Sequence, residues 1–458
     1  MKNIKKVTDR KDYQMQKDIK FIKSFFYELN KNKIRYCILR KANLILGGKA
    51  HDIDMVIDFS RMEEIKSILE NLSKNTGWNL FLKSTKDNGN LITIHYYIES
   101  NKTIEIVHFD FFKNFSWIDI PLIKNEDLLS KCVCENGIYS CSKENEAITK
   151  LFSRYLYHGY IKEEYKVDIV DIFLKYEQNI KNIMSQFLEY DYSEKVYEFV
   201  VNKRWDELTR LNKDIKRSIK EKYLSSSYKK IIYNFTNISF KLKRYINYNG
   251  VMIAFIGTDG SGKSTIIENL PKVLGRTFDE SQIKYYHWRP KYLKSLKGDK
   301  NLNVNVSEPH SKKPYGKVLS FLKFMYFNLD YIIGYWLSVK VHLGKNELVI
   351  FDRYYYDYLV DKYRYRLNLN DKIIKWTMRV IPKPHITFLL TGTPKVLYER
   401  KKEISLGEVE KQVNKVEKLK DILPDSKIIN VDKNISDVVF EVAMNILVSM
   451  EKSVNGDE

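Results

Sequence analysis

The fold of the second half of the chain is decided by residues 251–274, VMIAFIGTDGSGKSTIIENLPKVL. The apolar run at its start predicts a buried strand, and the pattern after Lys263 predicts a helix. The intervening segment, 257–265, has the spacing G-x-x-x-x-G-K-S, in which glycines let backbone N–H groups converge on phosphate oxygens. Because this motif lies between a strand and a helix, we interpret it as a phosphate-binding loop rather than a chance glycine-rich turn.

The loop predicts a site for ATP with Mg²⁺. We expect Lys263 to reach the β- and γ-phosphates and the Ser264 hydroxyl to bind the metal ion. The N-terminus of the following helix adds a positive dipole at the same point. The residues expected to bind ATP are Gly257, Asp259, Gly260, Ser261, Gly262, Lys263, Ser264 and Thr265.

A second segment, LVIFD at 348–352, is an apolar strand that ends in a carboxylate. This pattern is typical of the strand beside a phosphate-binding loop, where Asp352 would act through Mg²⁺ and its bound water. Arg353 follows directly, and its planar guanidinium can bind a phosphate through two hydrogen bonds. An Asp at a strand end can also be a simple turn residue, but its pairing with Arg353 favours the functional interpretation.

Three regions are expected, because 458 residues exceed one ordinary core. Residues 248–458 alternate strands with helices, which predicts an α/β domain with a parallel sheet flanked by helices. Residues 1–124 combine a helix at 17–31 with strands in an α+β arrangement, and residues 125–247 are predicted to be helical, ending in a basic linker. The expected strands are 34–39, 53–57, 91–98, 103–112, 251–256, 283–287, 348–351, 386–390 and 428–431.

Five segments share a pattern with known kinases: FIGTDGSGKST at 255–265, WRP at 288–290, DRYYYDYL at 352–359, TPKVLYERKKE at 393–403 and IINVD at 428–432. Through them residues 250–455 resemble the thymidylate kinase family. The resemblance implies an ATP-dependent kinase with a basic lid and dimerisation through this half. The implied catalytic residues are Lys263, Asp352, Arg353 and Arg400, and the implied acceptor-binding residues are Arg289, Arg353, Tyr354 and Asp357. The lid lysines Lys401 and Lys402 are equally well explained as surface residues.

Departures from the family pattern concern the phosphate acceptor. Asp357 and Lys362 stand where the family has a Ser and a Gln that seat the thymine base. A segment rich in Lys, Asn and Pro, 291–317, follows Arg289, and Arg364 and Arg366 add charge near the acceptor side. We therefore expect phosphoryl transfer to a phosphate-bearing or otherwise acidic small molecule, with strict dTMP phosphorylation as the alternative.

A weaker pattern lies in the N-terminal region, GGKAHDIDMVID at 47–58. Asp52 and Asp54 alternate on a predicted strand, so both point the same way and could bridge two Mg²⁺ ions, with Asp110 as the third carboxylate. Residues 18–160 resemble the nucleotidyltransferase superfamily, although here only three residues separate the glycine pair from Asp52. The resemblance implies a nucleotidyltransferase-like fold and a possible second activity. A solvated strand end is the alternative.

The net charge of +20 is concentrated in part at residues 203–244, which hold 13 basic and 4 acidic residues. We favour a solvated linker helix there over a surface for nucleic acid or an anionic membrane. A nucleic-acid-associated NTPase is thus the alternative from another functional class.

The remaining signals are weaker. The basic N-terminus lacks the apolar core of a signal peptide, and the apolar stretch 321–343 contains Lys323, Asp330 and Lys340, which favours a buried helix and a cytoplasmic protein without a transmembrane segment. Cysteines at 132, 134 and 141 flank Asn136-Gly137, a favoured hairpin turn, so strand residues are a better interpretation than a zinc site without a fourth ligand.

Overall fold

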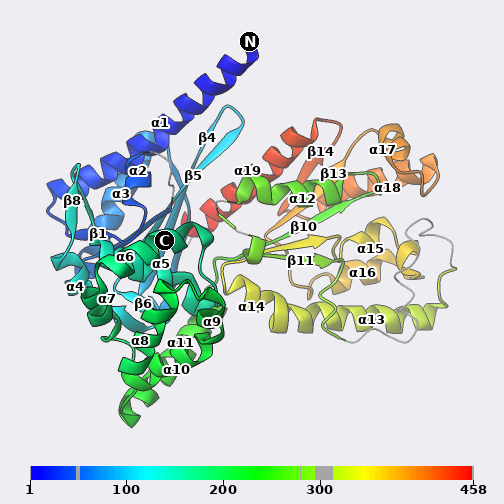
Figure 1. Cartoon of the computed structure of the whole chain (residues 1–458). Helices are drawn as coiled ribbons and strands as arrows, with labels where there is room; N and C mark the ends of the chain where they lie inside the picture. The colour runs from blue at the N-terminus through cyan, green and yellow to red at the C-terminus, as the bar shows by residue number, and fades with distance from the viewer. Residues whose placement is uncertain (1, 48–51, 276, 279, 294–312, 456–458) are drawn as a thin grey trace. The chain divides into compact units, whose positions relative to one another are not determined.

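The computed structural model describes residues 2–47, 52–275, 277–278, 280–293 and 313–455, and it is a mixed α/β protein (Figure 1). The chain divides into two compact units. The N-terminal unit comprises Met1–Glu99 and Glu105–Lys241, and the C-terminal unit comprises Leu242–Glu458 with the short segment Ser100–Ile104.

The N-terminal unit is built on a seven-stranded mixed sheet of order β3-β4-β5-β2-β1-β9-β8. Two further strands, β6 and β7, form a separate antiparallel pair. The strands are β1 (Tyr36–Ile38), β2 (Asp52–Ile57), β3 (Asn79–Lys86), β4 (Leu91–Ser100), β5 (Thr103–Phe112), β6 (Phe115–Trp117), β7 (Ile120–Ile123), β8 (Val133–Glu135) and β9 (Ile138–Ser140).

Helices cover this sheet and extend its core. Phe21, Phe25 and Leu29 of α1 are buried in one cluster with Phe109 of β5. Buried residues of α5 share a second cluster with Val56 of β2, so the helical region packs with the sheet. The helices are α1 (Lys2–Lys31), α2 (Ala42–Leu46), α3 (Met62–Thr76), α4 (Asn125–Ser130), α5 (Lys143–His158), α6 (Glu163–Lys175), α7 (Glu177–Met184), α8 (Tyr190–Val201), α9 (Trp205–Arg210), α10 (Asn212–Tyr223) and α11 (Ser227–Ile246).

The predicted hairpin at Asn136-Gly137 is confirmed, since β8 and β9 pair antiparallel around it. Both turn residues have positive φ, 51° and 76°, as a two-residue hairpin of this kind requires. Of the flanking cysteines, Cys134 is exposed and Cys141 is buried, with its thiol donating to the Leu39 carbonyl at 3.1 Å.

The C-terminal unit contains a five-stranded, wholly parallel sheet of order β11-β12-β10-β13-β14, as the alternating pattern predicted. The observed strands are within two residues of the predicted ones, and 283–287 agrees at both ends. They are β10 (Val251–Gly257), β11 (Ile283–His287), β12 (Leu348–Asp352), β13 (Ile386–Thr391) and β14 (Ser426–Asn430).

Helices lie on both faces of this sheet, which is why the whole of β10 is buried (Figure 1). Alternate β10 residues, Met252, Ala254 and Ile256, pack with α13, while α12 packs with α19. The helices are α12 (Lys263–Leu274), α13 (Lys317–Gly334), α14 (Lys340–Leu343), α15 (Asp357–Val360), α16 (Asp371–Thr377), α17 (Pro394–Arg400), α18 (Leu406–Lys418) and α19 (Ile435–Asn455).

The apolar stretch 321–343 is helical, as expected: it spans most of α13, a π-helical turn at Tyr335–Val339, and α14. The expected burial is only partial, because exposed large apolar side chains occur along it at Phe321, Leu322, Leu329, Trp336, Leu337 and Val341. In the described part of the chain, no helix combines the length and apolar character needed to cross a membrane.

The parallel register positions the candidate site. Phe255 pairs with Asp352, and Asp352 pairs with His287, so β10, β12 and β11 end at one edge of the sheet. The glycine-rich segment follows β10 at this same edge, which is where parallel α/β sheets bind their ligands.

Candidate active site

The segment between β10 and α12 forms a tight loop that depends on two glycines. Gly260 and Gly262 have φ of +80° and +79°, a conformation that favours glycine. A Cβ atom at Gly260 would lie 2.4 Å from the Leu397 carbonyl oxygen, so the loop passes directly against α17. This close approach places the loop next to the helix that ends at Arg400.

Lys263, the first residue of α12, folds its side chain back over the loop. Its Nζ donates to the carbonyl oxygens of Gly257 and Thr258, each at 2.9 Å, and to Ser261 Oγ at 3.2 Å. Burial lowers the pKa of Lys263, and the charge of Arg353 lowers it further, to about 8. A buried ammonium held by neutral oxygens is well suited to receive an anionic ligand.

Asp352, the last residue of β12, is a buried carboxylate with one oxygen engaged and one open. Tyr285 donates its hydroxyl to Oδ2 at 2.9 Å, and His287 Nδ1 lies 3.4 Å from the same oxygen. Burial would raise the pKa of Asp352, but the contact with His287 and the charges of Lys263 and Arg353 hold it at about 2.

The other carboxylate oxygen of Asp352, Oδ1, is buried and has no hydrogen-bond partner among the described residues. An anionic oxygen left open beside a phosphate-binding loop is the ligand type that Mg²⁺ or its water prefers. The donor set therefore fits a magnesium ion that Ser264 and Asp352 would hold.

Arg353 connects the loop to Asp357, one of the residues expected to bind the acceptor. Its Nη2 donates to Asp259 Oδ1 at 2.6 Å, and its Nη1 donates to Asp357 at 2.9 and 3.2 Å. Arg364 donates to the second oxygen of Asp259. Although burial would raise the pKa of Asp259, the charges of Arg353 and Arg364 lower it below its ordinary value.

The backbone at this edge is strained at two positions. Arg353 and Trp288 follow the paired ends of β12 and β11, and they have φ of 69° and 67°. A non-glycine residue in this region costs about 1–3 kcal/mol and persists only where the surroundings enforce it. Here the Trp288 N–H donates to the Asp352 carbonyl at 2.8 Å, and the Arg353 N–H to Phe255 at 3.0 Å.

Arg289, an expected acceptor-binding residue, is buried against α13. Its Nη1 donates to Asp330 Oδ2 at 2.6 Å, and Asp330 also accepts the backbone N–H groups of Lys291 and Leu293. One turn later on α13, a Cβ atom at Gly334 would lie 2.5 Å from the Pro290 side chain. The missing side chain of Gly334 therefore lets Pro290 pack directly against the helix. Most of the segment expected as an insertion, 291–317, lies outside the described residues.

The expected role of Tyr354 is corrected. Its side chain is buried and its hydroxyl donates to the Pro382 carbonyl at 2.5 Å. The ring packs on Tyr331 and Phe351, so Tyr354 is a core residue rather than an acceptor ligand. Lys362, which stands where the family has a Gln, forms an ion pair with Asp371, with its Nζ 2.6 Å from Oδ1.

A cavity of about 230 Å³ lies beside the loop, between α12, Arg400 and the segment after β14. Arg400 donates to the Val431 carbonyl at 3.1 Å at its edge, and Lys433 also lines it. The lining residues are Gly260, Ser261, Gly262, Thr265, Ile266, Arg400, Val431, Lys433, Ile435 and Val438.

A second cluster lies in the N-terminal unit, where β2 and β5 are parallel neighbours and Asp54 pairs in register with Asp110. Arg40 Nη2 lies 2.6 Å from Asp54. His108 lies between the other two carboxylates, 3.0 Å from Asp110 and 3.4 Å from Asp52. Each carboxylate expected to bind Mg²⁺ thus already contacts a basic side chain.

The three carboxylates expected to hold Mg²⁺ in the N-terminal unit do not form a metal-binding group in this structure. Among the residues that the structure describes, no group of three or more His, Cys, Asp or Glu side chains could hold a metal ion. Burial would lower the pKa of His108, but Asp110 and Asp52 raise it to about 10, so an imidazolium stands between the carboxylates. In this arrangement the residues do not fit a pair of Mg²⁺ ions. Gly48 lies outside the described residues.

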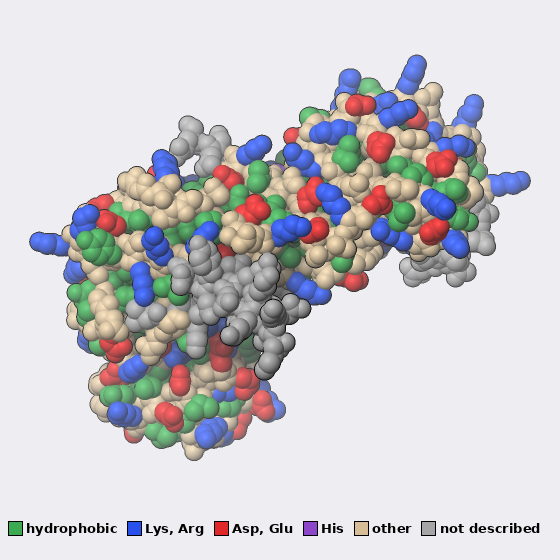
Figure 2. All heavy atoms as spheres, turned by 90° about the horizontal axis from the view of Figure 1, so that it is seen from above, with side chains coloured by type: hydrophobic (Ala, Val, Ile, Leu, Met, Phe, Trp, Pro, Cys, Tyr) green, Lys and Arg blue, Asp and Glu red, His purple; other side chains and the backbone are tan. Residues whose placement is uncertain are grey.

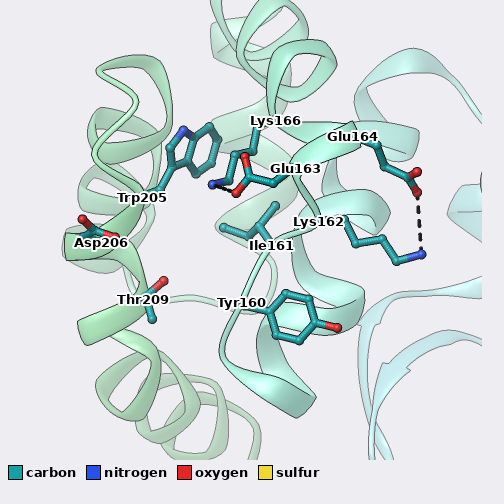
Figure 3. Close-up of a pocket in the computed structure, with 9 residues that line it drawn as sticks. All are labelled: Tyr160, Ile161, Lys162, Glu163, Glu164, Lys166, Trp205, Asp206 and Thr209. Atoms are coloured by element: carbon teal, nitrogen blue, oxygen red, sulfur yellow. Dashed lines mark hydrogen bonds and ion pairs between the residues drawn. The ribbon is translucent and has the colours of Figure 1, made fainter. Parts of the chain in front are cut away.

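A broad hollow of about 750 Å³ lies in the N-terminal unit (Figure 3). Lys162 faces Glu164 at 3.6 Å, and Lys166 faces Glu163 at 2.5 Å. None of the residues singled out from the sequence lines it. The volume of this hollow does not by itself provide groups that bind phosphate. We therefore place the candidate active site at the loop after β10.

Four residues of the candidate site were not predicted, or were only partly predicted, from the sequence. Tyr285 and His287 alternate on β11, where a strand pattern gives no sign that both reach Asp352. Asp330 lies inside an apolar helix, and its charge there was the available signal. Arg364 was noticed as a cation, but its partner Asp259 lies 105 residues away.

One comparison with known proteins finds a family match in the C-terminal unit. The thymidylate kinase family model matches residues 255–441. A solved structure of thymidylate kinase from Ehrlichia chaffeensis is 18% identical, covering 43% of this chain and 97% of its own, with a TM-score of 0.31. The search of curated proteins found no match. Residues 255–441 therefore form a thymidylate kinase-like domain, and the family match indicates an ATP-dependent kinase.

Proposed function

We propose that the C-terminal unit transfers the γ-phosphoryl group of ATP to a phosphate-bearing or otherwise acidic small molecule. The observation that carries the proposal is the meeting of Lys263 with the Asp352–Arg353 pair at one edge of the sheet. Phosphoryl transfer needs positioning and charge stabilisation more than covalent chemistry, and these residues supply both.

On the donor side, loop N–H groups and Lys263 would bind the phosphates, and the cavity between Gly260 and Val431 would take the nucleoside. Ser264 and Asp352 would hold Mg²⁺, which neutralises phosphate charge when bound. Arg400, at the edge of the cavity, would stabilise charge on the transferring group.

On the acceptor side, the contacts of two residues support a divergent substrate. Asp357 is fully buried and accepts from Arg353 and from the Tyr365 hydroxyl at 2.5 Å. Lys362 is bound to Asp371 and to the Leu369 carbonyl. Asp357 and Lys362 stand where the family seats thymine, and both are already bound to other residues of the protein. We therefore favour another acidic acceptor over dTMP.

The test is an acceptor screen with purified protein, ATP and Mg²⁺. Sugar phosphates, nucleoside monophosphates including dTMP, and short oligonucleotides are offered, and ADP and phosphorylated product are quantified. We expect an acidic small molecule other than dTMP to be phosphorylated, with stoichiometric formation of ADP. Rapid turnover of dTMP would establish the strict thymidylate kinase alternative, and ATP hydrolysis stimulated only by polynucleotide would establish the NTPase.

For the N-terminal unit, nucleotidyl transfer is the second candidate, supported by the register that pairs Asp54 with Asp110. Arg40 and His108 would have to release these carboxylates before metal ions could bind. The test of nucleotidyl transfer is to measure the release of pyrophosphate from nucleoside triphosphates. The phosphorylated product of the kinase reaction is added as the co-substrate. Loss of that release in Asp52→Asn/Asp54→Asn, with ADP production intact, supports a separate site, and no release in the unmodified protein rejects it.

A further inference from the structure

Helix α11 exposes a continuous apolar stripe. Between Tyr228 and Ile238, its exposed large apolar side chains lie one to three residues apart and are between 43% and 73% exposed. At 100° per residue this spacing gathers them on one side of the helix. Within the N-terminal unit, the stripe consists of Tyr228, Ile231, Ile232, Phe235 and Ile238.

The other side of α11 faces the N-terminal unit. Tyr233 packs against the buried cluster of that unit, and the Asn237 side chain accepts from Asn88 Nδ2 at 3.0 Å. These contacts fix the rotation of the helix, so the stripe points away from the core that α11 packs on. Solvent exposure of five large apolar side chains on one helix face is unfavourable, and such patches mark interaction sites.

The charge that α11 itself carries has one sign. From residue 222 to residue 258 the sequence contains no Asp or Glu, while the basic residues there are Lys222, Lys229, Lys230, Lys241, Lys243 and Arg244. On the face of the molecule that Figure 2 shows, basic and acidic side chains are interspersed. The segment of α11 is therefore both amphipathic and uniformly cationic.

We propose that α11 docks on an anionic membrane surface, with the stripe inserted at the level of the headgroups and the lysines in contact with lipid phosphates. A basic amphipathic helix of 20 residues has the composition of helices that lie in the membrane interface. Nucleic acid would use the cations but leave the apolar stripe in water. Pairing with α11 of a second copy would bring two sets of cations together without an acidic partner.

The experiment is co-sedimentation of the full chain with vesicles of phosphatidylcholine alone and of phosphatidylcholine with phosphatidylglycerol. Binding is expected to the anionic vesicles in preference, by about tenfold or more, and to weaken as salt is added. Lys229→Gln and Lys230→Gln are each expected to weaken it about fivefold, because each cation near such a surface contributes about that factor.

The stripe is tested with Ile231→Glu/Phe235→Glu, which should lose binding by about a hundredfold as two inserted side chains are removed. The matched control is Val167→Glu/Tyr190→Glu, whose side chains on α6 and α8 are 70% and 71% exposed and which carries the same added charge. The control should bind like the unmodified protein. Both variants should keep the thermal unfolding midpoint and ATP turnover, because the substituted side chains are exposed.

Several results would overturn the proposal: failure of the unmodified chain to sediment with anionic vesicles, equal binding to neutral vesicles, or equal loss in the Val167/Tyr190 control. Light scattering that shows a dimer, dissociated by Ile231→Glu/Phe235→Glu, would instead assign the stripe to a second copy. Polynucleotide binding lost in the same variant would assign it to nucleic acid.

Discussion

Arg353 Nη2 lies 2.6 Å from Asp259 Oδ1 and so joins the phosphate-binding loop to the end of β12 across 94 residues of sequence. The other Nη atom of Arg353 holds Asp357, which is fully buried. One planar cation thus fixes a carboxylate of the donor loop and a carboxylate of the acceptor side in a single geometry.

Arg353→Ala should lower the free energy of unfolding by about 3–5 kcal/mol, since it leaves two buried carboxylates without their shared cation. Arg353→Lys should lower it less but still reduce kcat/KM, because a single ammonium cannot reproduce the fork. Urea denaturation and steady-state kinetics measure the two effects. Arg379→Ala, at an exposed arginine of the same unit, is the control and should change neither.

Lys263→Ala should reduce kcat by about 10²–10³-fold, because one preorganised cation at the transferring phosphoryl group is removed. The measurement is ADP release at saturating ATP. Lys272→Ala, on the same helix but exposed, serves as the control. Equal rates for Lys263→Ala and the unmodified protein would contradict the assignment.

The pKa of Lys263, about 8 in the free protein, predicts proton uptake on ATP binding. Phosphate charge favours the ammonium form and so raises this pKa, and the binding reaction must then protonate the lysines that are neutral above pH 8. ATP affinity should therefore fall as pH rises through about 8, and calorimetry at about pH 9 in buffers of different ionisation enthalpy should show uptake approaching one proton. Uptake that persists in Lys263→Ala would assign the proton to another group.

Asp352→Asn should raise the Mg²⁺ concentration needed for half-maximal activity by about tenfold or more, since the open anionic oxygen is replaced by a neutral amide. ATP binding measured without Mg²⁺ should change little. Asp371→Asn removes a carboxylate that pairs with Lys362 at the surface, and it should leave the Mg²⁺ dependence as it is. A rise of similar size in both variants would point to a general loss of charge.

The features of the C-terminal unit that depend on contiguous residues could be predicted from the sequence. The loop after β10 was predictable because strand, glycines and helix are contiguous, and Asp352 because an apolar run ends there. Contacts between distant segments were not, since no spacing links Arg364 to Asp259 or Arg289 to Asp330. Tyr354 was misassigned because a motif gives residue order but not the direction of a side chain, which here points to Pro382.

In the N-terminal unit the strands that carry Asp54 and Asp110 were predicted, and their register makes the two residues neighbours. The basic side chains that contact these two carboxylates were not predicted. Arg40 and His108 have ordinary sequence surroundings, and only the folded sheet brings them to Asp54 and Asp110. A pattern of carboxylates alone therefore overstates the case for metal binding.

The central claim is that the C-terminal unit phosphorylates an acidic small molecule, and the acceptor screen with ATP and Mg²⁺ tests it most directly. We predict stoichiometric formation of ADP and of a phosphorylated acceptor that carries a phosphate or carboxylate, both lost in Lys263→Ala. If no small molecule accepts phosphate, while ATP hydrolysis depends on added polynucleotide, the claim is contradicted.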